Sequence, residues 1–547
     1  NASNVGVGYR ALYGITTGGS NIAIGRLAGA NVTTANSNMY IGYAAGYGNQ
    51  TGTNNTIVGN YSLSQTVGIV NFTNVTTLGW EAGYYATGSK NTFVGSEAGK
   101  GNSSAPFSSG QNNVAVGYQA LKGFTTGGAN IAIGYQAGND ITTGGDNTIM
   151  GYQAGDAITT GNDNVIIGKT AGDGLTSAAN NVLVGSGAGD GASIDSSNGI
   201  AIGQSAGSGN NLTANVFIGK DAGNSPNDGV AASHNVGIGY QTLRNIGGDA
   251  VGNIAIGRGA GSAGITNNPD NGGKYNTFIG HLVARHFTSG SFNIIMGGDN
   301  GNAAGEHLED GSNNIILGKG AGRGNPNATH NPEHNVWIGS DVVSSETITT
   351  PVGTVGIGQN ALQDLVDQDE LVGIGRHALQ KIVGTNSTAV GYEAGRYATG
   401  SSNTFVGSEA GKGGTTSAPY SSGGSNTAIG YQALTGFTTG GTNTAVGAYS
   451  LDAVTTGTAN VGIGYYAGSS ITDGFQNIVI GENAGDTMTS TRYTVLIGHT
   501  AGTAINSTDA NGTIAIGYQA GYGITSGRYQ TLVGYNAGVS ITEGDGN

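Results

Sequence analysis

A short apolar phrase recurs along the whole chain and predicts a regular β architecture. It reads Asn, a β-branched residue, a variable residue, Ile or Val, then Gly, as in residues 130–134 and 443–447. Thirty such glycines align from Gly8 to Gly534, and of the 29 intervals between them 14 are 17 residues and none is below 16. A fixed period of this kind indicates units that stack on their neighbours.

Alternation within the phrase predicts a short strand. The residue before the Gly is aliphatic in all thirty repeats, and the residue two earlier is Val, Ile or Thr in 29, with Met39 as the exception. The residue between these two positions varies in size from Gly6 to Trp337. Two strict apolar positions around a tolerant one indicate a strand with one buried face, so we expect the strict positions in the core.

Other repeat positions suggest how a coil closes. Ala stands three residues past the Gly in 24 of 30 repeats and predicts a second short strand packed close to the first. Asn opens 22 of 30 repeats, and stacked Asn side chains form stabilising ladders. Glycines supply the corners. The expected structural residues include Asn21, Asn130, Asn147, Asn164 and Asn443, then Ile24, Ile133, Ile167 and Val446, then Gly25, Gly134, Gly168 and Gly447.

The predicted fold class is therefore all-β: a parallel β-solenoid, or β-roll, of about 30 coils with a period of about 17 residues. We expect one continuous array over residues 1–547, with a loop-rich section at about 260–370. Block 86–138 returns as 398–451, and each copy carries a Ser-Ala-Pro-aromatic-Ser-Ser loop. The pattern begins at Asn4 and breaks off at Asn547 without a cap, so we expect an excerpt of a longer chain or units that stack head to tail.

Composition narrows the class of protein. With 106 Gly and only 7 Pro, a collagen helix is excluded. The formal net charge of −14 disfavours nucleic acid as a partner, and the absence of cysteine excludes disulfides. No apolar run approaches the length that spans a bilayer, and no export signal opens the sequence, so we expect no membrane insertion of this segment.

Candidate chemistry is sparse, and we expect no enzyme and no obligatory cofactor. His330 and His334 have metal-like spacing, but they fall in a loop without a further ligand. The acidic stretch Asp364–Glu370 could collect calcium, although it lacks the glycine-rich nonapeptide of calcium-binding β-rolls. Thr-Thr pairs such as Thr142-Thr143 could form an ice-binding array, but turn chemistry explains them equally well.

Aromatic residues that follow the repeat Gly predict a stripe at one corner: Tyr118, Tyr135, Tyr152 and Tyr431. One interpretation is structural, with rings that stack coil on coil or line a seam between subunits. The other is functional, because flat aromatic faces suit sugar rings. Both interpretations stay open from sequence alone.

The phrase Asn-Thr-Ala-Ile-Gly-Tyr-Gln-Ala resembles the head repeat of trimeric autotransporter adhesins and the repetitive shaft of phage tail-fibre-like proteins. The resemblance implies a left-handed parallel β-roll that is homotrimeric, exposed at a surface and used for attachment. The usual autotransporter coil is shorter than 17 residues, and no stalk, barrel anchor or chaperone is present in these residues. The tail-fibre-like interpretation therefore fits better.

We accordingly expect an extracellular fibre shaft at a cell or virion surface, whose rigid coils carry loops that bind glycans or a host surface. The main alternative is an extracellular filament or matrix subunit that stacks head to tail. A glycan-degrading spike and an ice-binding solenoid are weaker alternatives, since the former needs paired carboxylates on neighbouring coils and the acidic residues are scattered through the sequence.

Overall fold

The structure is a computed structural model that describes residues 3–65, 70–104, 107–191, 195–225, 232–246, 250–262, 273–299, 301–324, 330–345 and 347–546. The chain divides into two compact units, Asn1–Tyr275 and Asn276–Asn547, and each is described by itself. Both consist of parallel coils with a period of about 17 residues and almost no helix, which confirms the predicted fold class. The handedness of the coil and the continuity of the array between the units stay predictions.

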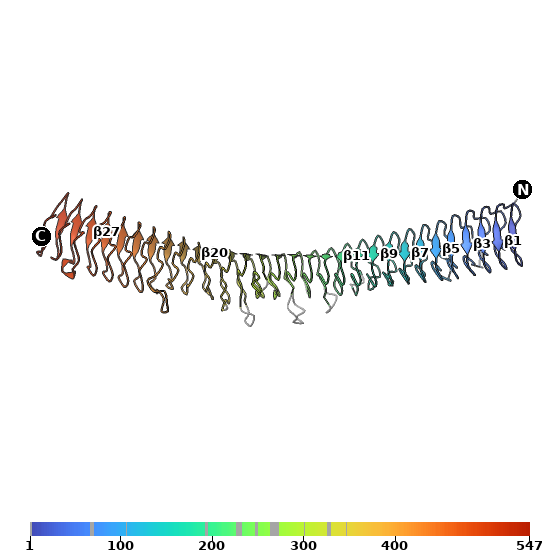
Figure 1. The fold of residues 1–547 in the computed structure, drawn as a ribbon, viewed down its shortest axis with the longest axis horizontal. Helices are drawn as coiled ribbons and strands as arrows, with labels where there is room; N and C mark the ends of the chain where they lie inside the picture. Colours follow the sequence, from blue (N-terminus) through green and yellow to red (C-terminus); the bar gives the residue numbers. More distant parts are fainter. Residues whose placement is uncertain are drawn as a thin grey trace. The chain divides into compact units, whose positions relative to one another are not determined.

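The N-terminal unit stacks its strands in chain order (Figure 1). Each strand pairs in parallel with the next, residue for residue, as Ile131 does with Thr148. The strands are β1 (Val5–Val7), β2 (Ile22–Ile24), β3 (Met39–Ile41), β4 (Thr56–Val58), β5 (Thr76–Leu78), β6 (Thr92–Val94), β7 (Val114–Val116), β8 (Ile131–Ile133), β9 (Thr148–Met150), β10 (Val165–Ile167), β11 (Val182–Val184), β12 (Ile200–Ile202), β13 (Val216–Ile218), β14 (Val236–Ile238) and β15 (Ile254–Ile256).

The C-terminal unit follows the same plan, and Thr444, for example, pairs with Val461. Its elements are β16 (Thr277–Ile279), β17 (Ile294–Met296), β18 (Ile315–Leu317), β19 (Val336–Ile338), β20 (Val355–Ile357), β21 (Val372–Ile374), β22 (Thr388–Val390), β23 (Thr404–Val406), β24 (Thr427–Ile429), β25 (Thr444–Val446), β26 (Val461–Ile463), β27 (Ile478–Ile480), β28 (Val495–Ile497), the 3₁₀ turn η1 (Thr508–Ala510), β29 (Ile514–Ile516) and β30 (Thr531–Val533). Parts of the expected loop-rich section, residues 263–272, 300, 325–329 and 346, lie outside the described residues.

The strands bury their tolerant middle residue and turn the two strict positions outward, so our expectation for the core was wrong. Ala23 is fully buried, whereas Ile22 and Ile24 are 37% and 41% exposed. The same alternation recurs in the later strands, among them those of Ile133, Ile167 and Val446. Period-2 alternation separates two faces, but it does not say which face is inside when both are apolar.

Variation at the middle position is absorbed by the neighbouring turns. Where the middle residue is Gly462, an added Cβ would lie 2.6 Å from Cγ of Leu451, so the leucine already fills that space. Where it is Phe93, the ring occupies the place that a side chain at Gly99 would need, with the nearest ring atom 2.4 Å from an added Cβ. Core volume is therefore shared between adjacent segments, which explains why Gly and Trp337 both occur at this position.

The segment after the repeat Gly forms consecutive turns. The second strand that we expected from the small alanines is wrong: apart from isolated bridges, the described part of each coil holds one strand. In the coil of Gly134, the N–H of Gln136 donates to the carbonyl of Tyr118 at 2.9 Å and the N–H of Gly138 to that of Ala154 at 2.9 Å. Alanine is required because its methyl group points into the narrow core, where Ala137 is fully buried.

The repeat Gly is required by close contact between coils. Gly134 has a φ of +139°, and an added Cβ would lie only 2.2 Å from the carbonyl oxygen of Gly151 in the next coil. Gly25, Gly168 and Gly447 have the same positive φ and the same approach to the following glycine carbonyl. Any side chain here would force the stacked coils apart.

A ladder of buried asparagines joins the coils. Oδ1 of Asn147 accepts from the backbone N–H of Asn164 at 3.1 Å and from its Nδ2 at 2.9 Å. Nδ2 of Asn147 donates to Oδ1 of Asn130 at 3.0 Å and to the carbonyl of Gly161 at 2.9 Å. Asn21 and Asn443 make the same set of contacts with their own neighbours. Each amide is thereby satisfied without water.

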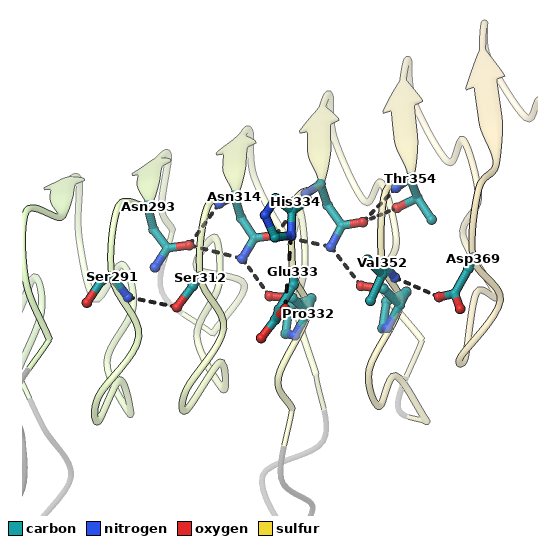
Figure 2. A network of polar contacts seen from close by, with 12 residues as sticks. Ser291, Asn293, Ser312, Asn314, Pro332, Glu333, His334, Val352, Thr354 and Asp369 are labelled. Atoms are coloured by element: carbon teal, nitrogen blue, oxygen red, sulfur yellow. Dashed lines mark hydrogen bonds and ion pairs between the residues drawn. The ribbon is translucent and has the colours of Figure 1, made fainter.

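Figure 2 shows this ladder in the C-terminal unit, where it spans longer coils and ends on a threonine. The N–H and Nδ2 of Asn314 both donate to Oδ1 of Asn293 at 3.0 Å, although 21 residues separate the two asparagines. Thr354 replaces the next asparagine after Asn335 and donates both its N–H and its hydroxyl to Oδ1 of Asn335. Threonine can therefore continue the contact to the preceding coil.

We predict that Asn147→Ala lowers the free energy of unfolding by about 3 kcal/mol, because it leaves buried donors of Asn164 without their acceptor. Asn147→Thr should cost less, since threonine is used at this position elsewhere in the chain. Chemical denaturation of the two variants measures the difference. Equal stability of Asn147→Ala and the parent chain would contradict the role of the ladder.

Candidate functional site

The tyrosine stripe is a stack of rings along one corner. Tyr118 and Tyr135 have ring centroids 5.5 Å apart, and Tyr135 and Tyr152 lie 5.0 Å apart at an interplanar angle of 8°. The three rings are 42–49% exposed. Tyr135, the inner ring, has a ring on each of its two faces and so presents its edge outward. Sugar stacking needs a free face, so the stack itself favours the structural interpretation, while glycan contact stays a prediction.

Tyr431 differs from the other three predicted aromatics. Its ring meets Tyr449 edge to face at 5.3 Å, and Tyr449 in turn stacks on Tyr466 at 4.7 Å. Tyr431 remains 45% exposed. This corner of the C-terminal unit is thus an aromatic cluster in which Tyr431 is partly exposed.

At the Thr-Thr corners, some of the threonine hydroxyls donate hydrogen bonds to backbone carbonyls. The hydroxyl of Thr125 donates to the carbonyl of Thr142 at 3.0 Å, and that of Thr142 donates to Thr159 at 3.0 Å. In these pairs the first threonine is half-buried and the second, Thr126 or Thr143, is exposed. One exposed rank of hydroxyls is left at this corner, which is the part that an ice-binding role would have to use.

The residues weighed for metal binding lie apart or are already engaged. His330 is fully buried and its Nδ1 contacts the carbonyl of Ile348, whereas His334 lies at the surface beside Glu333. In the acidic stretch, Asp364 pairs with Lys381 and Asp369 accepts from the N–H of Val352 at 2.8 Å. Among the described residues, no group of three or more His, Cys, Asp or Glu side chains gathers as a metal site.

A half-buried charge network appears once in each unit and was not found from sequence. In the N-terminal unit Lys100 Nζ lies 2.6 Å from Glu81 and 2.7 Å from Glu97, and Lys122 lies 3.0 Å from Glu97. In the C-terminal unit Lys412 lies 2.6 Å from Glu393. Glu97, Lys100 and Lys122 lie in the first copy of the duplicated block and Lys412 in the second, whereas Glu81 and Glu393 precede the two copies. The contacts of Lys100 with Glu81, of Lys122 with Glu97 and of Lys412 with Glu393 join successive coils, so stacking brings these partners together.

These partners shift the titration of the buried carboxylates. Burial alone would raise the pKa of Glu97, but hydrogen bonds from Lys100, Gln119 and Lys122 outweigh it and lower the pKa to about 2. The pKa of Glu393 is lowered as well: burial raises it, and Lys412 and Tyr392 more than offset that. A lowered carboxylate pKa stabilises the fold above the ordinary pKa and loses this effect as the pH falls toward 2.

Carboxylates also stack on one another in the N-terminal unit. Asp156, Asp173 and Asp190 each lie eight residues after the start of their strand, and these strands pair in register. Burial, a hydrogen bond with Asp173 and the charges of Asp173 and Asp140 raise the pKa of Asp156 to about 7. Burial and Asp173 also raise the pKa of Asp190. The 17-residue spacing of these aspartates is the sequence signal that could have found the column.

The aspartate column places carboxyl groups of successive coils next to one another. Burial is the main cause of the raised pKa of Asp156, and the neighbouring Asp173 adds to it, so Asp156 is partly protonated near neutral pH.

The duplicated loops have the same anchored stems. In the C-terminal unit the N–H of Gly414 donates to the carbonyl of Phe437 at 2.8 Å and that of Ser421 to Tyr397 at 3.0 Å. Tyr420 stacks over Tyr397 at 6.2 Å, and residues 416–419 at the tip are exposed. In the N-terminal unit Ser108 and the Phe107–Tyr85 pair, at 6.4 Å, repeat this arrangement, while residues 105 and 106 lie outside the described part.

Comparison with known proteins assigns the chain to no family. No protein-family model matches the chain, and no curated protein resembles it significantly in sequence. No helix in the described residues is long and apolar enough to cross a bilayer.

We predict that Asp156→Asn raises the melting temperature by a few degrees at pH 8 and has little effect at pH 4. The raised pKa means that Asp156 supports the fold while protonated and loses this contribution as the pH rises through about 7. Asn139 already occupies the equivalent place one coil earlier, so asparagine fits. Thermal unfolding across pH is the measurement; a variant less stable than the parent at pH 8 would refute the assignment.

Glu97→Gln should destabilise the chain at pH 7 by roughly 1–3 kcal/mol, the usual range for hydrogen bonds to a charged group. The deficit should shrink as the pH falls from 4.5 to about 2, where the parent carboxylate is also neutralised. Glu393→Gln is the matched variant in the second copy and should behave alike. A deficit that is constant with pH would show that packing, and not charge, is responsible.

Proposed function

We propose that the chain is the shaft of an extracellular adhesive fibre, at a cell or virion surface, which holds ligand-binding loops on a stiff stack of coils. The observation that supports the proposal is that an inserted loop does not interrupt the stacked coils of the shaft. Asn426 donates its N–H to Oδ1 of Asn403 at 2.9 Å although the two are 23 positions apart in the sequence, so the ladder continues past the inserted loop. A chain built to display loops needs this independence.

Placement of the loops supports display as well. The insertion in the C-terminal unit leaves its coil between the turn segment and the ladder asparagine, at the corner that ordinary coils close with Thr-Thr-Gly. In Figure 1 the longer loops of this unit leave from the edge opposite the strands. The exposed tip carries the hydroxyl groups of Thr416 and Ser417 and leads into Tyr420, which stacks on Tyr397, a combination that suits hydroxyl-rich ligands such as glycans.

The proposal assigns no reaction and no cofactor to the chain. Its partners are glycans or a host surface at the loops and further copies of the chain along the shaft. Stacking of units head to tail into a filament is the alternative. Sedimentation separates the two: a discrete oligomer supports the fibre, and indefinite polymers that grow with concentration favour the filament.

Removal of the loop tips is predicted to abolish adhesion. Deletion of residues 415–420 and of residues 103–107 restores 17-residue coils in both copies and leaves the ladder asparagines in place. Binding of the purified chain to glycan arrays and to cells should fall below detection.

Deletion of one whole coil, residues 147–163, is the matched control, because it removes 17 residues in register and no loop tip. This variant should bind as the parent chain does. Full binding by the doubly trimmed chain would remove the loops from the proposal, and a parent chain that binds no glycan and no cell would overturn the adhesive role.

A further inference from the structure

In each unit the outward side of the sheet carries an uncharged, mainly apolar surface, which we call the sheet strip. It consists of the first and third residues of the strands, β1–β15 in one unit and β16–β30 in the other. No charged residue occurs at either position in any of the strands. Along the strip, the third-position residues Ile24, Met150 and Ile256 are 39–41% exposed, although this position is Ile, Val, Leu or Met in every strand.

Strand formation alone does not account for the strip. Threonine forms strands as readily as Val or Ile, and the first position uses it in ten strands. The third position is Ile, Val, Leu or Met in all thirty and never Thr. Since both positions point outward, the restriction at the third one indicates contact with an apolar surface outside the coil.

The size of the strip matches a protein interface. Fifteen strands spaced about 4.8 Å apart give each unit a strip of about 70 Å, and three residues per strand make it about 10 Å wide, or roughly 700 Å². The largest apolar patch on a typical monomer is roughly 300–600 Å². A standard stable interface takes about 800 Å² from each partner, so one unit supplies nearly all of one side.

The spacing of the coils and the net charge of the chain indicate which partner packs on the sheet strip. The strip presents a ridge of side chains at every coil, and only a surface with the same spacing can interdigitate with it over many coils; a second copy of this chain has that spacing. The chain also carries a net charge of −14, so two copies repel each other over most of their surface. The uncharged strip is where they can meet without opposing like charges.

We propose that a second copy of the chain packs sheet against sheet on this strip, at the separation of about 10 Å usual for stacked sheets. The inference deepens the proposed fibre by naming the contact that joins its chains. Tyr118, Tyr135 and Tyr152, two residues beyond the strip in their coils, form its aromatic margin. Aromatic residues are enriched at such interfaces.

The decisive variant places three lysines on the strip of adjacent coils: Ile133→Lys, Met150→Lys and Ile167→Lys. Its control carries Thr126→Lys, Thr143→Lys and Thr160→Lys, which add the same charge at the exposed corner of neighbouring coils. Circular dichroism and melting temperature establish that both fold. In analytical ultracentrifugation the parent and the control should form the same discrete oligomer, and the strip variant should associate at least tenfold more weakly.

Cysteine cross-linking provides an independent readout, because the chain has no native cysteine. Met150→Cys should give a covalent pair on mild oxidation, whereas Thr143→Cys should associate as the parent does but give no covalent pair. A parent chain that is monomeric at micromolar concentration, or a strip variant with the parent's mass, would overturn the proposal. Monomers that bind phosphatidylcholine vesicles, and lose this on lysine substitution, would assign the strip to a lipid surface instead.

The two proposals fail separately. Glycan and cell binding of the strip variant measures the loops alone, since the substituted residues lie on the strands. Retained binding with lost association leaves the fibre proposal standing and confirms the strip. Retained association with no binding by any chain leaves the strip standing and removes the adhesive role.

Discussion

In-register stacking is the constraint on which the rest of this structure depends. Each position of a coil lies against the same position of the next, so a side chain must be compatible with another copy of its own kind. Asparagine meets this demand in a buried place because its amide both donates and accepts along the stack. The contacts of Asn130, Asn147 and Asn164 use that capacity in full, and so the most buried polar column is also among the most regular.

In-register stacking also decides which charged groups lie beside each buried carboxylate. Glu81 and Glu97 occupy the same place in two successive coils, and Lys100 of the second coil lies against both, so each carboxylate has an ammonium group beside it. Asp156 lies beside Asp173 of the next coil, like on like, and burial together with this neighbour raises the pKa of Asp156 instead. A single geometry thus produces a carboxyl pKa of about 2 in one column and of about 7 in another.

Stacking also explains why insertions are accepted. The ladder from Asn403 to Asn426 and the sheet from β23 to β24 are both kept across a 23-residue coil. The extra residues leave at a corner where ordinary coils have only a turn. The sequence of the shaft must therefore be strictly periodic, whereas the sequence of the loops is free to vary. The proposed division of roles, in which the shaft supports and the loops bind, rests on this property.

Much of the fold followed from sequence, because a repeat that cannot bury a core alone must stack, and its period sets the coil length. The ladder position, the turn glycines and the strands were all readable in that way. Which face of the strand is buried could not be predicted in this way. The alternation around Ala23 shows that the strand has two faces, and only the packing of the turns shows that Ala23 is inside while Ile22 and Ile24 face outward. The charge network of Glu97 and the column of Asp156 were likewise decided by the tertiary structure, since residues about 17 apart become neighbours only when the coils stack. Sequence by itself determined the period and the architecture, and three-dimensional packing decided which surface is left for a partner.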